Sequence, residues 1–192
     1  MKRLLFLGLT AFALAVAFGQ EFRLGAPVTN FSLTDVKANQ VSFANLRGDI
    51  TVVMFVATQC PVSNAYNDRM KALYNGYAPK GVKFVVINSN SSEPAVEVAA
   101  HAAAHGFPFP VYKDPGNVVA DRFGAQVTPE TYVLDRTGVI RYHGSIDDSQ
   151  NPANIKSQGL HLALDAVLAG QPVTKAETKA FGCSIKRGRA AS

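Results

Sequence analysis

The 192-residue sequence predicts an α/β domain in which helices flank a mixed central sheet, with an N-terminal β-hairpin extension. Two continuous apolar runs, 51–57 and 82–88, are rich in β-forming residues and have the composition of strands buried on both faces. Segments with helical spacing follow each run, and the C-terminal part has the pattern of a hairpin followed by a helix. A parallel βαβ half joined to an antiparallel ββα half builds such a mixed sheet.

The first half of the domain begins with residues 27–47, which fit a short hairpin because apolar and polar residues alternate around turn residues. After the first buried strand, residues 61–77 show helical spacing, and Pro61 stands in the first turn, where a missing N–H costs nothing. The Ala-rich segment 94–105 is expected to form a second helix, because Gly106 follows its last residue.

The second half is expected to contain shorter elements. In order, they are an extended piece at 107–112, a short helix at 116–123, a hairpin of strands at 131–134 and 138–142, and a helix at 155–168 closed by Gly170. The domain is therefore predicted to span residues 20–170, and residues 171–192 are expected to form a C-terminal tail that carries Cys183.

Residues 1–19 are predicted to be a secretory signal peptide. Lys2 and Arg3 form a basic start, an apolar run follows at 4–18, and Ala17-Phe18-Gly19 supplies the small residues of a cleavage site. The run is shorter than the roughly 20 apolar residues that a membrane-spanning helix needs. We therefore expect an exported protein, periplasmic or extracellular, without stable membrane association after cleavage.

Composition narrows the function classes. The chain is 47% hydrophobic and 17% charged, which is ordinary for a soluble globular protein. Part of the formal net charge of +5 comes from Lys2 and Arg3, and the sequence contains no nucleic-acid-binding motif, so no nucleic-acid partner is expected. The chain has only two cysteines, Cys60 and Cys183, which excludes a dense disulfide framework.

Cys60 is the main candidate for chemistry, because it lies where the first buried strand ends and a helix begins. The unpaired N–H groups and the dipole of a helix start favour a thiolate over a thiol. Ligands and reactions also gather at the carboxyl ends of strands in open sheets. The alternative is an inert, buried cysteine. The strand-to-helix position favours a reactive one.

Four segments together resemble the thioredoxin-like superfamily, in its peroxiredoxin-like (redoxin, AhpC/TSA) branch. They are the strand-Cys-helix segment VVMFVATQCPVS, the Val127-Thr128-Pro129 step followed by TYVLD, the stretch from Tyr112 to Gly116, and the closing hairpin GVIRYHGSID. The resemblance covers residues 27 to about 170 and implies a thioredoxin fold. It also implies that Pro129 follows a cis peptide bond and faces the active cysteine.

The sequence departs from this family pattern at two places. The second cysteine of a thioredoxin Cys-x-x-Cys motif is Ser63 here, and a hydroxyl cannot form a disulfide. Around the peroxide-attacking cysteine, true peroxiredoxins resemble Pro-x-x-x-Thr-x-x-Cys, but the corresponding positions before Cys60 are Val53 and Ala57. The sequence is therefore identified as similar to a subgroup with its cysteine at the first Cys-x-x-Cys position.

Cys183 is the remaining candidate partner for Cys60. An exported chain with two cysteines favours the hypothesis that Cys183 folds back and resolves Cys60 through an intramolecular disulfide. A purely structural bond and two free thiols are the alternatives. No metal site or cofactor is expected, because Cys60 lacks a nearby second thiolate. Surface positions are the preferred interpretation for the histidines, which are His101, His105, His143 and His161.

The predicted function is that of an exported thiol-disulfide oxidoreductase, or antioxidant-type redoxin, with Cys60 as nucleophile and Cys183 as candidate resolving cysteine. Its partner would be a disulfide- or thiol-containing protein, a small thiol or a peroxide. The residues expected to contact the thiolate or the partner are Thr58, Gln59, Ser63, Thr128 and Pro129. One alternative is a thiol peroxidase that forms a sulfenic acid at Cys60. The other is a non-enzymatic binding protein with a thioredoxin fold.

Overall fold

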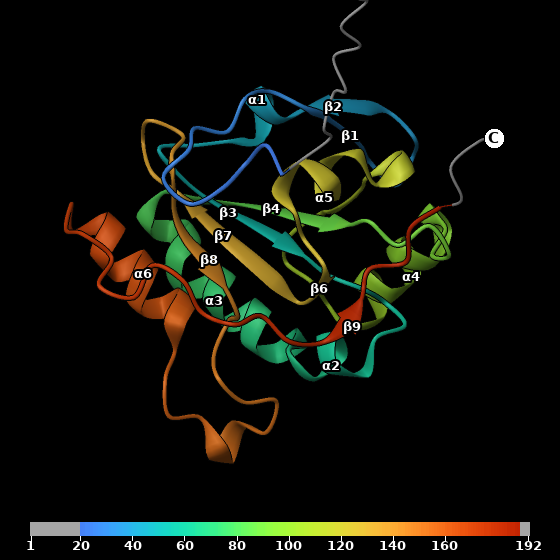
Figure 1. Ribbon diagram of the computed structural model, residues 1–192. Helices are drawn as coiled ribbons and strands as arrows, with labels where there is room; N and C mark the ends of the chain where they lie inside the picture. Colours follow the sequence, from blue (N-terminus) through green and yellow to red (C-terminus); the bar gives the residue numbers. More distant parts are fainter. Residues whose placement is uncertain (1–19, 189–192) are drawn as a thin grey trace, which may run out of the picture.

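A computed structural model describes residues 20–188 of the chain, so the predicted signal peptide lies outside the described residues. Its central sheet has seven strands in the order β2-β1-β5-β4-β3-β7-β8 (Figure 1). The strands β3, β4 and β5 are parallel, and all other neighbours in the sheet are antiparallel. The strand bounds are β1 Ser32–Thr34, β2 Gln40–Ser42, β3 Ile50–Phe55, β4 Val82–Asn88, β5 Val111–Lys113, β7 Glu130–Leu134 and β8 Ile140–Gly144.

Helices cover both faces of this sheet, as the sequence predicts. The α-helices are α1 Phe43–Leu46, α2 Pro61–Ala65, α3 Asn67–Tyr77, α4 Ala95–Ala104, α5 Val118–Phe123 and α6 Gly159–Leu168. Short 3₁₀ turns form at η1 Ala78–Lys80, η2 Pro115–Asn117 and η3 Pro152–Asn154. One core cluster packs α3, α4 and α6 against one sheet face, and the other packs α1, α5 and the N-terminal hairpin against the opposite face.

The alternation of side chains along β3 explains why this strand is apolar throughout. Val52 and Met54 point into the first core cluster, whereas Val53 and Phe55 point into the second. Every residue of β3 is buried. A strand in this position needs no polar face, and its carboxyl end opens directly into the segment that carries Cys60.

The structure differs from the predicted elements at several boundaries. The helix expected over 61–77 is two helices, α2 and α3, which meet at Tyr66. The N–H of Tyr66 bonds to the Ser63 carbonyl three residues back, and its buried hydroxyl donates to Asp147. The helix expected from residue 155 begins only at Gly159, because the chain is still extended at Ile155.

The segment after α6 does not leave the domain. It crosses the molecule to β9 (Cys183–Ser184), which pairs with β6 (Val127–Thr128) in a separate two-stranded sheet close to α2 (Figure 1). Along the way, the Ala176 carbonyl accepts a hydrogen bond from the N–H of His143. We call residues 171–188 the C-terminal arm. Within residues 20–188, no helix is both long enough and apolar enough to cross a membrane.

Candidate active site

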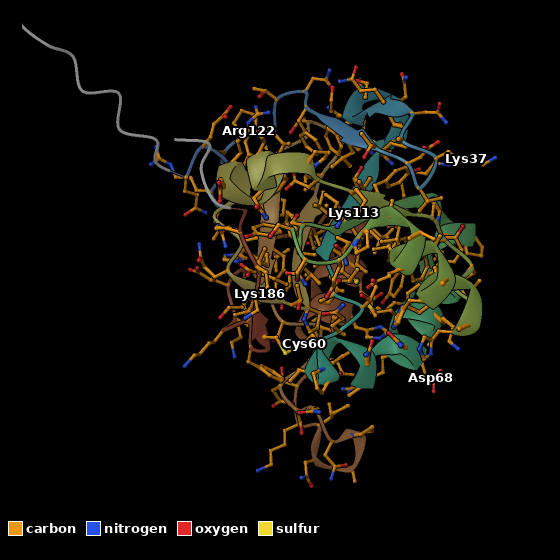
Figure 2. The ribbon with its side chains drawn as sticks, turned by 90° about the vertical axis from the view of Figure 1, so that its right-hand side faces the viewer. Lys37, Cys60, Asp68, Lys113, Arg122 and Lys186 are labelled. Atoms are coloured by element: carbon orange, nitrogen blue, oxygen red, sulfur yellow. A yellow bond between two sulfur atoms is a disulfide. The ribbon has the colours of Figure 1, made fainter. Side chains whose placement is uncertain are left out.

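Cys60 occupies the position that the sequence predicts, directly before α2 and after the end of β3. Its backbone is extended and it serves as the N-cap residue of α2, with Pro61 as the first helical residue. The backbone N–H of Ser63 donates to the Cys60 sulfur at 3.3 Å. Figure 2 labels Cys60 at this helix start. The residue is only 2% exposed, so little of it can be reached from solvent.

The Cys60 sulfur is joined to Cys183 in a disulfide, as the pairing hypothesis predicted. The two residues are 123 positions apart in sequence, and their Cα atoms are 5.8 Å apart. Cys183 reaches the site as part of β9, in which it pairs directly with Thr128 of β6. The bond therefore closes a loop that contains most of the domain.

The wall opposite Cys60 is the step from Thr128 to Pro129, whose peptide bond is cis, as the resemblance implied. The Thr128 carbonyl oxygen lies 3.5 Å from the Cys60 sulfur. Gly182 approaches the same carbonyl so closely that a Cβ atom on it would overlap the oxygen. Only glycine fits there, so the residue before Cys183 is fixed by how closely the arm packs on β6.

Glu93 holds the segment that leads into Cys60. Its carboxylate is 2% exposed and accepts hydrogen bonds from the backbone N–H groups of Thr58 at 2.8 Å and Gln59 at 3.0 Å. It also accepts from the side-chain amides of Asn88 and Asn90. Burial by itself would raise the pKa of Glu93, but the hydrogen bonds from Thr58, Asn88 and Gln59 outweigh burial and hold the pKa below its ordinary value.

Asn90 connects this network to the C-terminal arm. While its amide nitrogen donates to Glu93, its oxygen accepts the backbone N–H of Lys186 at 2.7 Å. The ammonium of Lys113 donates to the Asn88 side chain and to the carbonyls of Asn90 and Glu93. Burial lowers the pKa of Lys113, although Glu93 and Asp114 oppose that shift. Figure 2 shows Lys113 and Lys186 on the same side of the molecule as Cys60.

Further contacts hold the arm on both sides of Cys183. After it, Ile185 is buried in the second core cluster, and its N–H bonds to the Gln126 carbonyl. The Arg187 side chain then reaches Asp121 and the Ala125 carbonyl. Before Cys183, the Thr178 hydroxyl lies 2.7 Å from the Tyr142 hydroxyl, and no side chain larger than glycine fits at Gly144, which packs against Thr178.

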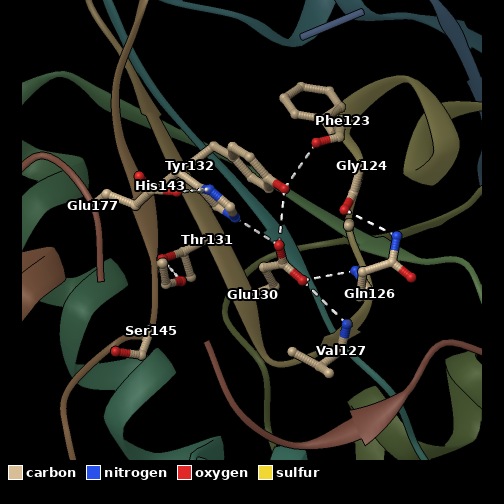
Figure 3. Close-up of polar contacts among 12 residues, drawn as sticks. Phe123, Gly124, Gln126, Val127, Glu130, Thr131, Tyr132, His143, Ser145 and Glu177 are labelled. Carbon is tan, nitrogen blue, oxygen red and sulfur yellow. Dashed lines mark hydrogen bonds and ion pairs between the residues drawn. The ribbon is translucent and has the colours of Figure 1, made fainter. Parts of the chain in front are cut away.

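A second buried carboxylate, Glu130, follows Pro129 directly. It accepts hydrogen bonds from the backbone N–H groups of Gln126 and Val127 and from the Tyr132 hydroxyl, and His143 Nε2 lies 2.7 Å from it (Figure 3). Burial would raise the pKa of Glu130, but the His143 contact and the two N–H donors lower it overall. Glu130 thus fixes both ends of the turn that presents Thr128 and Pro129.

The predicted partner-contact residues lie around Cys60, with one difference from the expectation. Ser63 contributes its N–H to the sulfur, while its hydroxyl accepts from the N–H of Ala57. Thr58 and Gln59, which were expected to hydrogen-bond the thiolate, direct their N–H groups to Glu93. Their backbone N–H groups therefore hold the buried Glu93 carboxylate against the loop that leads into Cys60.

The four histidines, expected at surface positions, differ in how far they are exposed. Only His105 is exposed, whereas His101 is half-buried against Asn64, His143 against Glu130 and His161 against Tyr77. Burial lowers the pKa of both His101 and His161. In the described part of the chain, no three His, Cys, Asp or Glu side chains are grouped so that they could hold a metal ion.

Sequence reasoning missed Glu93, Asn90, Glu130 and Gly182 as parts of the site. One available signal was the polar run Asn88-Ser89-Asn90 at the end of a buried strand, because polar residues at that place must find partners. Nothing in the local sequence indicates that Gly182 lies against Thr128.

Comparison with known proteins places this geometry in context. Residues 24–143 match the AhpC/TSA family. The thiol-disulfide oxidoreductase ResA of Halalkalibacterium halodurans is 28% identical over 149 residues, which cover 73% of this chain and 84% of that protein. An uncharacterized conserved protein from Geobacillus kaustophilus, of known crystal structure, is 36% identical and has a TM-score of 0.82, covering 88% of this chain and 95% of its own.

A secreted disulfide oxidoreductase of Mycobacterium tuberculosis shares the fold alone, with a TM-score of 0.56 and 20% identity over 71% of this chain and 95% of its own. The predicted thioredoxin fold is thereby confirmed. The relatives named as thiol-disulfide oxidoreductases also confirm the predicted enzyme class, a thiol-dependent oxidoreductase. Since the match extends over more than half of the sequence, the chain belongs to the AhpC/TSA family.

Proposed function

We propose that this protein is an exported thiol-disulfide oxidoreductase whose redox centre is the pair of Cys60 and Cys183. The observation that carries the proposal is their disulfide, which lies beside the cis step from Thr128 to Pro129. A purely structural disulfide requires no such setting. The ResA relatives support an exchange activity, and we infer that the partner here is a thiol-containing protein.

The proposed reaction is a two-electron exchange at this bond. When two thiols of a partner reduce the pair, the bond between the two sulfurs breaks, the partner acquires a disulfide, and Cys60 and Cys183 become thiols. In the opposite direction, the two protein thiols reduce a partner disulfide. Because the Ser63 N–H donates to the Cys60 sulfur, we assign Cys60 as the better stabilised thiolate of the pair, which leaves when the disulfide opens and acts as the nucleophile that closes it again.

The residues around the pair support this assignment. Glu93 and Glu130 hold the two chain segments that face each other across the disulfide. A rigid frame of this kind keeps two sulfurs within bonding distance in both redox states, and a reversible couple requires that. Thr128 and Pro129 are proposed as the wall against which the partner is positioned.

The proposal that the protein is exported rests on residues 1–19. The pattern of residues 1–19 supports a cleaved signal peptide, and a disulfide persists most readily in an oxidising compartment. We expect the mature protein recovered from the native cell to begin near Gln20. Its intact mass measures this directly, and a cytosolic full-length product would contradict the proposal.

The decisive experiment compares wild type with Cys60→Ala and Ser184→Ala. Oxidised protein is mixed with a reduced dithiol under native conditions, and alkylation then reports its thiol content over time. Wild type should accept two electrons and return them to a disulfide-containing model protein such as insulin. Cys60→Ala should lose this cycle, whereas Ser184→Ala, which changes an exposed neighbour of Cys183, should keep it. Equal rates in all three proteins would refute the proposal.

Hydrogen peroxide separates this activity from peroxide reduction. Val53 and Ala57 occupy the positions at which the peroxidases resembled here carry proline and threonine. We therefore expect reduced protein and stoichiometric peroxide to form sulfenate no faster than a free thiol does. A much faster reaction, followed by closure of the Cys60–Cys183 bond, would instead identify a thiol peroxidase.

A further inference from the structure

The two sulfurs of the redox pair differ in how they can be reached. Cys60 is 2% exposed, whereas Cys183 is only half-buried and precedes the exposed Ser184. We propose that Cys183 is the sulfur that exchanges with the partner, and that Cys60 attacks or leaves from inside the protein. This inference rests on the proposed exchange function and reverses the usual expectation that the cysteine before the helix meets the partner.

The surroundings of Cys60 keep its sulfur covered. The Thr128 carbonyl lies 3.5 Å from it, and the Ser63 N–H occupies another direction at 3.3 Å. The arm also lies beside the sulfur, because Cys183 is bonded to it and pairs with Thr128 of β6. A partner thiol that attacked Cys60 would have to displace this pairing first.

Displacing the arm is costly, because it is held independently of the disulfide. Ile185 is buried in the core, and the Lys186 N–H bonds to the Asn90 side chain. Before Cys183, the Thr178 hydroxyl is hydrogen-bonded to the Tyr142 hydroxyl and accepts a hydrogen bond from the N–H of Ser145. Cys183 thus lies between two anchored segments, and breaking the disulfide leaves those anchors in place. The accessible sulfur should therefore be the same one in both redox states.

The chemistry of exchange favours the same direction of attack. When a partner thiolate attacks Cys183, a partner–Cys183 disulfide forms and Cys60 leaves as a thiolate that retains the Ser63 hydrogen bond. A second partner thiolate then attacks the partner sulfur of that bond and releases Cys183. The partner loses two electrons and the protein gains them. In reverse, Cys183 attacks a partner disulfide, and Cys60 then attacks Cys183 and expels the partner as a thiolate.

The inference is tested by finding which cysteine first carries an added thiol. Oxidised wild-type protein is mixed with limiting reduced glutathione and quenched at short times with N-ethylmaleimide. Peptide mass mapping then locates both groups, and a time course is extrapolated to zero to remove later migration. We expect glutathione on Cys183 and the maleimide on Cys60. Glutathione on Cys60, or equal labelling of the two, would overturn the inference.

Dithiothreitol separates this inference from the proposed function. If dithiothreitol reduces the native disulfide but glutathione is found on Cys60, the exchange function stands, and only the inference that the partner attacks Cys183 is wrong. If it cannot reduce the pair without unfolding the protein, the exchange function fails, and the present inference fails with it.

Single-cysteine variants supply an independent measurement. The rate of reaction with Ellman's reagent is compared for Cys183 in Cys60→Ser and for Cys60 in Cys183→Ser, each relative to the same variant unfolded in guanidinium. We expect the relative rate, native over unfolded, to be at least about tenfold higher for Cys183 than for Cys60, since access limits thiol exchange. Adding Ile185→Ala to Cys183→Ser should loosen the arm and raise the Cys60 rate. Equal native rates for both thiols would contradict the inference.

Discussion

The two halves of the proposed redox centre are built in different ways. Cys60 stands on a short connection between β3, a strand buried along its whole length, and α2. Cys183 reaches the same place on an arm whose only strand is the two-residue β9. The first half belongs to the continuous core of the fold. The second is held by separate contacts with β6, β8 and the loops at the end of the sheet.

This difference shows how a thioredoxin fold can pair Cys60 with a second cysteine when Ser63 stands at the second cysteine position of the motif. Ser63 fills that position and serves the site through its backbone N–H and a hydroxyl that accepts from Ala57. The missing sulfur is supplied by a remote segment. That solution requires a docking surface, and Asn90 provides part of it because it contacts both Glu93 and the arm.

Reducing the Cys60–Cys183 disulfide, which joins the two halves, should change the free energy of unfolding more than any substitution considered in the following paragraphs. The disulfide spans 123 positions, so its reduction returns a large loop-closure entropy to the unfolded chain and should lower the free energy of unfolding by about 4–5 kcal/mol. Urea unfolding with and without dithiothreitol measures the difference. Cys183→Ser is the control, since dithiothreitol should not change its stability. A difference below about 1 kcal/mol would mean that the bond contributes little beyond the arm contacts.

The Cys60 half is tested by Glu93→Gln. The substitution keeps the size of the side chain. Each carboxylate oxygen of Glu93 accepts one N–H, from Thr58 or from Gln59. An amide has only one oxygen, so its N–H₂ group would face the other N–H, and two donors would meet. Because hydrogen bonds to a buried charge are lost, we expect a destabilisation of about 3 kcal/mol. Glu97→Gln, at an exposed position bonded only to the Gln59 side chain, should be nearly neutral.

Glu93 should also make the stability of the protein depend on pH. Because the pKa of Glu93 is lowered in the folded protein, its contribution to stability is complete above the ordinary glutamate value and is lost as pH falls through the lowered pKa. Urea midpoints measured from neutral pH down into the acid range should therefore decline, and less steeply in Glu93→Gln than in wild type. Parallel curves for the two proteins would contradict this role of the carboxylate.

The Cys60 half could be predicted from the sequence, whereas the docking of the Cys183 arm could not. The strands 51–57 and 82–88 and the strand-Cys-helix segment follow from local hydrophobic patterns, and the structure places them within a few residues of the expected bounds. The docking of the arm depends on residues such as Gly182, whose fit against Thr128 exists only after folding. No local pattern encodes it. The pairing of Cys60 with Cys183 was predictable only because the chain has two cysteines and is expected to be exported.

A smaller effect is expected from Ile185→Ala, which weakens the arm after Cys183. Ile185 is 5% exposed at the margin of the second core cluster, so its truncation should cost about 2 kcal/mol, the lower end for a buried aliphatic side chain. The cost should fall on the arm, so amide hydrogen exchange should increase at β6 and β9 more than in β3. Leu162→Ala, at an exposed position of α6, is the matched control and should change neither measurement.

The smallest effect should come from Arg187→Ala. Its ion pair with Asp121 is 2.8 Å long but lies at the surface, where such pairs contribute less than about 1 kcal/mol. The substitution also removes a hydrogen bond to the Ala125 carbonyl, so a small loss of stability should survive in high salt. Urea unfolding of wild type and Arg187→Ala at low and high ionic strength separates these contributions. If the substitution cost as much as Ile185→Ala, the ion pair at the end of the arm would hold the arm as strongly as the buried Ile185 does, which would contradict this ranking.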